Sequence, residues 1–158
     1  MKQDNADFMQ RAIQLAREGM QRNEGGPFGA LVIKDGQIIG RGNNQVTSSN
    51  DPTAHAEIVA IREACRHLNS FQLDDCVLFT SCEPCPMCLG AIYWARPSQV
   101  FYACTRHDAS QAGFDDSFIY EEIQADIYDR KIPMTQLGRE DALRLFEEWR
   151  AKEDRVEY

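Results

Sequence analysis

Two short segments about thirty residues apart carry the side chains that most constrain this fold. The first is His55-Ala56-Glu57, and the second is Pro84-Cys85-Pro86-Met87-Cys88. One imidazole and two thiolates fill three positions around a tetrahedral Zn²⁺ ion and leave the fourth open for water. The two segments therefore predict a site in which His55, Cys85 and Cys88 bind zinc. Glu57 is then placed to move protons rather than to bind the metal.

The cysteine segment is typical of the start of a helix. Cys85 and Cys88 are three residues apart, so in a first helical turn they lie on one face. Pro86 suits the first helical position, because its missing N–H would have no partner there. The positive end of the helix dipole, together with Zn²⁺, favours both cysteines as thiolates.

The histidine segment sets a geometric condition. Residues i and i+2 of a regular helix point about 200° apart. His55 and Glu57 can therefore share one site only if His55 lies in the irregular first turn of its helix.

A closed structural zinc site is the alternative interpretation of the cysteines. Cys82 extends the pattern to Cys82-x-x-Cys85-x-x-Cys88, and structural zinc sites often use three or four thiolates. However, no second pair stands at zinc-ribbon spacing, and His-x-Glu would then be a coincidence. We therefore expect Cys82 to lie outside the ligand set. The remaining cysteines lie in apolar stretches and are expected in the core: Cys65, Cys76 and Cys104.

Length and charge narrow the class of protein. The 158 residues fit one domain spanning 1–158, and no apolar run approaches the roughly 20 residues of a membrane span. The polar, acidic start is unlike a signal peptide, so we expect a cytoplasmic protein with reduced thiols. The formal net charge of −8 favours a small neutral substrate over nucleic acid, whose binding proteins gather Lys and Arg on one face.

The apolar pattern predicts a layered α/β domain with helices on both sides of a mixed sheet. Asp35-Gly36 indicates a tight hairpin, and 43–50 a polar loop. Residues 117–133 are ambiguous. Helices are expected over 6–20, from Asp51-Pro52 through Leu68, from Pro86 to about Ala95, and over 139–152; strands are expected over 28–34, 37–41, 76–80 and 99–103.

The two metal-binding segments resemble the cytidine deaminase-like superfamily, whose zinc nucleobase deaminases carry H-x-E followed by P-C-x-x-C. More narrowly, three further stretches are similar to bacterial zinc-dependent guanine deaminases: Gly25–Ala30, Leu89–Pro97 and Ala112–Tyr120. The resemblance covers nearly the whole chain and includes the terminal Glu157-Tyr158.

The resemblance implies a three-layer α/β/α fold with a central five-stranded mixed sheet. It implies one Zn²⁺ per subunit and hydrolytic deamination of guanine to xanthine and ammonia. Glu57 would be the main proton shuttle, and Asp116 a second proton carrier near the departing amino group.

The resemblance also implies contacts with the substrate. Phe28 would stack on the purine, while Asn44 and the backbone N–H of Ala56 would hydrogen-bond its edge. The protein would be a homodimer that exchanges its C-terminal segment, so that Tyr158 closes the active site of the other subunit.

Three other functions stay open. A tRNA adenosine deaminase has the same zinc chemistry but needs a basic platform, which the acidic composition does not favour. A deaminase of another ring, such as cytosine or a triazine, is possible because pocket shape decides the base. A non-catalytic, zinc-stabilised binding module would have no need for Glu57.

Overall fold

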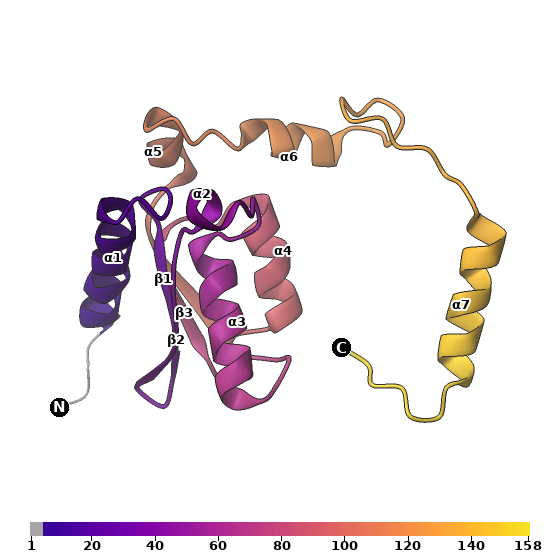
Figure 1. Ribbon diagram of the computed structural model, residues 1–158, viewed down its shortest axis with the longest axis horizontal. Coiled ribbons are helices and arrows are strands. Elements are labelled where there is room, and N and C mark those ends of the chain that lie inside the picture. The colour runs from indigo at the N-terminus through magenta and orange to yellow at the C-terminus, as the bar shows by residue number, and fades with distance from the viewer. Residues whose placement is uncertain (1–4) are drawn as a thin grey trace. The chain divides into compact units, whose positions relative to one another are not determined.

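The computed structural model describes residues 5–158 (Figure 1). The chain divides into two compact units, of which the first ends at Asp116 and the second runs from Ser117 to Tyr158. The first four residues of the acidic start lie outside the described part. Among the described residues, no helix is both long and apolar enough to cross a membrane.

A four-stranded mixed sheet forms the middle layer of the first unit. Its strands are β1 (Gly29–Lys34), β2 (Gln37–Asn43), β3 (Val77–Cys82) and β4 (Gln99–Cys104), in the order β2-β1-β3-β4. β1 is antiparallel to β2 and β3, whereas β3 and β4 are parallel. Asp35 and Gly36 have φ angles of 50° and 74°, which the predicted hairpin turn requires.

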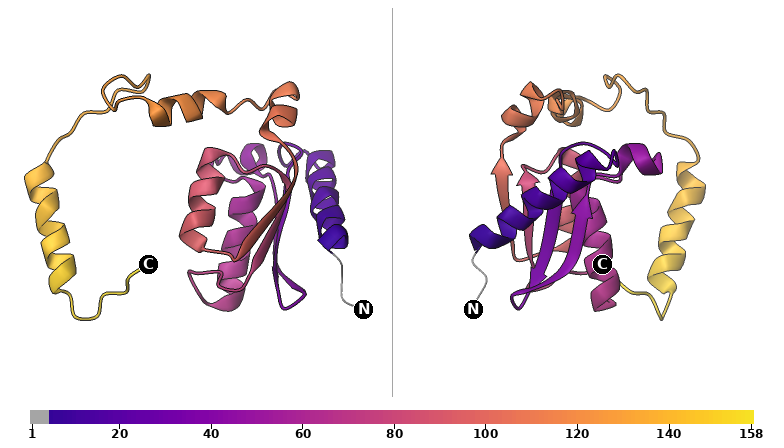
Figure 2. Two further views of the ribbon diagram at one scale, coloured as in Figure 1. Left: turned by 180° about the vertical axis from the view of Figure 1, so that it is seen from behind. Right: turned by 60° about the vertical axis from the view of Figure 1, so that its left-hand side comes forward.

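Helices cover both faces of this sheet, as predicted. α1 (Asn5–Gln21) lies on one face, and α3 (Ala56–Leu68) with α4 (Pro86–Ala95) lies on the other (Figure 2). Alternate side chains of β1 point to opposite faces. Two buried clusters result: one contains Phe8, Ala12, Leu31, Ile33 and Phe79, and the other includes Val32, Ala60, Ala64, Leu78 and Ile92.

The expected fifth strand is absent from residues 5–158. Directly after β4 the chain enters α5 (Arg106–Gln111), because Thr105 and Asp108 form a capping box. The Asp108 carboxylate accepts the Thr105 N–H at 2.8 Å, and the Thr105 hydroxyl oxygen accepts the Asp108 N–H at 3.3 Å. These bonds start a helix directly after β4, and the elements that follow along the chain are the helices α5, α6 and α7, so no described segment after Cys104 adds a strand to the sheet.

Three further predictions for the first unit were wrong. α3 begins at Ala56, because Asp51 accepts the Thr53 N–H at 2.8 Å and closes a turn of its own instead of capping the helix. The expected polar loop contains the short helix α2 (Val46–Ser49). Cys104 is exposed at the end of β4 and does not lie in the core.

The second unit contains α6 (Ser117–Gln124) and α7 (Arg139–Ala151), and α7 matches the predicted terminal helix. None of the residues of these two helices is buried. On these two helices, four large apolar residues each have more than half of their own surface exposed: Phe118, Ile123, Leu145 and Phe146. This unit thus presents a large apolar surface of the kind that marks an interaction site.

Candidate active site

The three predicted zinc ligands meet at the first turns of two helices. His55 is the N-cap of α3, Cys85 is the N-cap of α4, and Cys88 is the third residue of α4. Pro86 is the first residue of α4, as predicted. Among the described residues, these three form the one group of His, Cys, Asp and Glu side chains whose ligand atoms converge, all within 4.8 Å.

The spacing of these atoms fits zinc. Nδ1 of His55 lies 3.5 Å from the Sγ atom of Cys85 and 3.5 Å from that of Cys88. Zn–N and Zn–S bonds of about 2.1 and 2.3 Å, set at the tetrahedral angle, place nitrogen and sulfur about 3.6 Å apart. The three side chains are therefore arranged to hold a tetrahedral zinc ion with little movement.

The geometric condition on His55 and Glu57 is met. The backbone of His55 is extended, with φ −69° and ψ 156°, so this residue stands before the first helical turn. Glu57 is 6% exposed, and its Oε2 atom lies 3.4 Å from Sγ of Cys88. Burial raises the pKa of Glu57. A buried carboxyl group thus stands beside the ligands without being one of them.

The thiol groups of Cys85 and Cys88 and the imidazole of His55 lie within hydrogen-bonding distance, and these contacts shift their pKa values. Hydrogen bonds from the Cys88 thiol and from His55 lower the pKa of Cys85 to about 4. The same bond, together with burial, raises the pKa of Cys88, and the bond to Cys85 raises the pKa of His55. A divalent cation that binds here replaces those protons.

Cys82 lies outside the cluster, as predicted. Its thiol donates to the carbonyl oxygen of Thr105 at 3.7 Å, and burial raises its pKa to about 11. A thiol of this kind is a poor metal ligand.

The amide of Asn44 is fixed in one orientation next to Phe28. The N–H of Asn44 donates to the carbonyl oxygen of Phe28 at 3.0 Å. Its Oδ1 atom accepts the N–H groups of Gly26 and Val46 at 3.3 and 3.1 Å. The side chain therefore presents N–H donors rather than an acceptor. A Cβ atom on Gly25 would collide with Oδ1 and the backbone of Asn44, so only glycine permits this approach.

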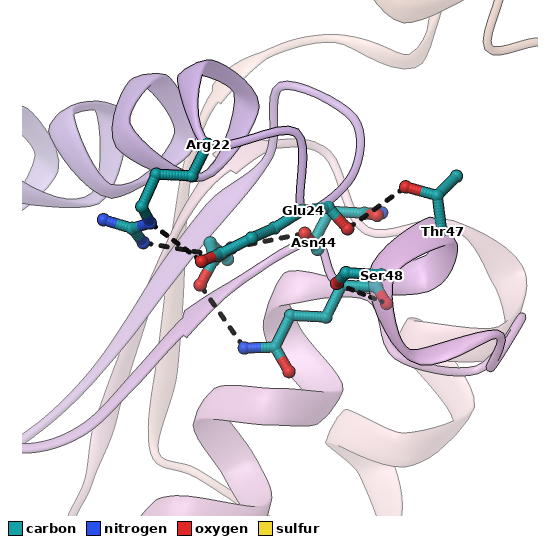
Figure 3. A network of polar contacts seen from close by, with 7 residues as sticks. Arg22, Glu24, Asn44, Thr47 and Ser48 are labelled. Atoms are coloured by element: carbon teal, nitrogen blue, oxygen red, sulfur yellow. Dashed lines mark hydrogen bonds and ion pairs between the residues drawn. The ribbon is translucent and has the colours of Figure 1, made fainter.

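A network centred on Glu24 holds residues 43–48, which we call the Asn44 loop, next to the end of α1 (Figure 3). The Glu24 carboxylate accepts from Arg22 at 2.8 Å and from the side-chain amide of Asn43 at 2.5 Å. Its carbonyl oxygen accepts from the Thr47 hydroxyl and the Ser48 N–H at 3.2 and 3.1 Å. The bonds from Arg22 and Asn43 lower the pKa of Glu24.

The remaining candidate residues have different surroundings. Ala56 is the first residue of α3, so its N–H has no acceptor within the helix. Burial raises the pKa of Asp116, and electrostatic repulsion from the negative charge of Cys85 raises it further. Asp116 therefore interacts electrostatically with one of the three ligand residues. Phe28 is half-buried and meets Phe114 edge-on, with 4.9 Å between ring centroids. Tyr158 belongs to the second unit and is exposed.

A His-Cys-Cys ligand set with a buried glutamate on a three-layer α/β/α fold defines a zinc-dependent deaminase. In agreement, the family model of the cytidine and deoxycytidylate deaminase zinc-binding region matches residues 2–104. The chain belongs to this family.

Known relatives match different shares of the chain. Guanine deaminase of Bacillus subtilis (strain 168) is 58% identical over 151 residues, which cover 96% of this chain and 97% of the relative. The crystal structure of guanine deaminase from Bacillus subtilis matches with a TM-score of 0.96 and 56% identity over 99% of both chains.

Two other relatives are more distant. A guanine deaminase structure from Nitrosomonas europaea has a TM-score of 0.69 at 32% identity and covers 72% of this chain and 65% of its own. A tRNA-specific adenosine deaminase of Aquifex aeolicus is 41% identical over 96 residues, 61% of this chain and 63% of the relative.

Proposed function

We propose that this protein hydrolyses guanine to xanthine and ammonia. The observation that carries the proposal is the extent of the similarity. The Bacillus subtilis guanine deaminase matches 96% of the chain, whereas the match to the Aquifex aeolicus tRNA-specific adenosine deaminase ends at 61%. The net charge of −8 also favours a free base over a polynucleotide.

The residues of the site divide the chemistry between them. His55, Cys85 and Cys88 would hold Zn²⁺, which would supply a Lewis acid that lowers the pKa of a bound water molecule. Glu57 takes a proton from the attacking water and delivers it to ring N3, which makes C2 more electrophilic. The raised pKa of this buried carboxyl suits it to carry a proton in both directions.

Other groups orient the base and release the product. The N–H donors of Asn44 and of the Ala56 backbone bind acceptor atoms on the purine edge, and Phe28 stacks on its face. The departing amino group is protonated, and released as ammonia, by Glu57 or by the second proton carrier, Asp116. Its raised pKa favours this role, because the protonated form persists to higher pH.

We further infer a cytoplasmic homodimer of a single-domain chain spanning 1–158. α4 supports a dimer surface, since Leu89, Tyr93 and Trp94 are 40%, 75% and 62% exposed on a helix whose other face is already in the core. The apolar surface of α6 and α7 supports exchange of the C-terminal segment, with Tyr158 closing the active site of the other subunit. Six free cysteines fit a reducing compartment.

The direct test is ammonia release from guanine by the purified, zinc-loaded protein. Adenine, cytosine, a triazine, guanosine and a tRNA anticodon stem-loop are assayed alongside. Rapid release from guanine alone is expected. Activity on the stem-loop without activity on guanine would replace the proposal with tRNA editing, and activity on another ring would change the substrate. Silence on every substrate with zinc bound would favour a binding module.

Removing Tyr158 should raise the KM for guanine by about fivefold, the loss expected for one hydrogen bond or ring contact. The kcat should change less, because the zinc ligands and Glu57 stay in place. Steady-state ammonia release with a chain ending at Glu157 measures both. A Tyr158→Phe variant separates the hydroxyl from the ring, and unchanged kinetics in both variants would argue against closure by the tail.

Replacing Glu24 with alanine should raise the KM for guanine about fivefold, because the buried side-chain amide of Asn43, next to Asn44, loses its acceptor. The matched control is Arg22→Ala. It removes only an ion pair whose partners are 54% and 29% exposed, which contributes little. The KM of the control should stay within about twofold of the wild type. Equal effects of the two variants would locate the contribution in the ion pair instead.

A further inference from the structure

A hydroxyl group lies buried beneath the catalytic carboxyl group. Thr80 belongs to β3, an inner strand of the sheet, and is 1% exposed. Its Oγ1 atom lies 3.1 Å from Oε1 of Glu57 and 3.0 Å from the carbonyl oxygen of Cys82. The next residue on the same face of β3, Leu78, is part of the apolar cluster under α3. A polar side chain buried this deeply requires a hydrogen-bond partner.

The hydroxyl has one proton and two acceptors within reach. An ionised carboxylate is the stronger acceptor, because its charge strengthens and shortens the hydrogen bond. The Thr80 hydroxyl therefore donates to Oε1 of Glu57, and the carbonyl oxygen of Cys82 is a second acceptor within reach. With two acceptors within reach, the buried hydroxyl is not left as an unpaired donor in the core.

The two oxygen atoms of Glu57 have different neighbours. Oε1 faces Thr80, whereas Oε2 faces Sγ of Cys88 at 3.4 Å and thus the ligand cluster. The terminal torsion of a glutamate has no sharp intrinsic preference, so an outside partner must fix the plane of its carboxyl group. Thr80 is that partner on the side away from the ligands.

We propose that Thr80 is a positioning residue for Glu57. Its hydrogen bond to Oε1 turns Oε2 toward the zinc ligands, where the proton is exchanged. This inference rests on the proposed function, because it takes Glu57 as the proton carrier. Thr80 is not one of the three converging ligand residues, so it acts through Glu57.

Thr80→Val tests the inference, since valine keeps the branched shape and removes the donor. We expect kcat for guanine to fall about 10- to 100-fold, the range for a lost hydrogen bond to a charged group. KM should stay within about twofold, and zinc content should be unchanged. Thr80→Ser restores the hydroxyl and should recover most of kcat. Thr80→Cys, a weaker donor, should lie between serine and valine and provides a further variant if valine impairs folding.

A double-mutant cycle separates positioning from a general structural effect. In a Glu57→Gln background, Thr80→Val should change the residual rate by less than about twofold, because the group that it positions no longer carries protons. An equal loss in both backgrounds would overturn the inference. So would a Thr80→Val enzyme with wild-type kcat, or a Thr80→Ser enzyme that is no better than Thr80→Val.

Crystal structures of the Thr80→Val and Thr80→Ser proteins give a readout independent of turnover. The Glu57 carboxyl group should be rotated or present in two orientations in the valine variant and unchanged in the serine variant. An unchanged carboxyl group in Thr80→Val would refute the positioning role. If the wild type releases no ammonia from guanine, the proposed function fails, yet these structures still decide whether Thr80 orients Glu57.

Discussion

Glu57→Gln should lower kcat for guanine by about 10³-fold, within the range that general acid–base catalysis contributes. Glutamine has the same shape and can still accept the Thr80 hydrogen bond through its amide oxygen. It cannot take up and return a proton, so only proton transfer is lost. Steady-state ammonia release measures the rate. Atomic absorption should show one zinc ion per chain, because the three ligands remain.

Glu63→Gln is the matched control for this variant. Glu63 also lies on α3 and accepts a backbone hydrogen bond, from Arg41 at 3.0 Å, but it lies far along the helix from the ligand cluster. Its kcat should stay within about twofold of the wild type, as for most surface substitutions. A Glu57→Gln rate close to that of this control would mean that another group, such as Asp116, carries the main proton.

The ligand set could be predicted from the sequence because ligand chemistry depends on local spacing. Cys85, Pro86 and Cys88 lie within a single helical turn, and a turn has the same geometry in any fold. The position of His55 before the helix could be stated only as a condition, since Asp51-Pro52 offered an earlier start. An aspartate before proline forms a turn as readily as a helix cap, and the choice depends on tertiary contacts.

Other features depend on the whole fold and left no local signal. A threonine in an apolar strand is common, so Thr80 gains meaning only when α3 places Glu57 above it. Likewise, Glu24 reads as a surface residue until the chain brings Asn43 and Thr47 to it. The predicted number of strands was wrong because it came from the resemblance and not from a strand pattern in these residues: the elements after β4 are helices, and the sheet has four strands.

Removal of zinc by a chelator should abolish turnover and lower the melting temperature by about 10 °C. A ligand bound at about a thousand times its Kd stabilises a protein by about 4 kcal/mol, and each kcal/mol is worth about 2–4 °C in a chain of this length. Zinc ties the first turns of α3 and α4 together, so its loss frees both helix starts. Thermal unfolding with and without the metal measures the difference, and added zinc should restore both properties.

The difference in melting temperature should shrink as the pH falls. In the metal-free protein the pKa values of His55 and Cys88 are raised, so both groups hold protons that zinc must displace. Lower pH strengthens this competition, and the apparent zinc affinity falls.

Cys82→Ser is the matched control for Cys88→Ser: the former should keep its zinc at neutral pH, whereas the latter should lose it. Loss of zinc from Cys82→Ser would move Cys82 into the ligand set and make the site a closed, structural one.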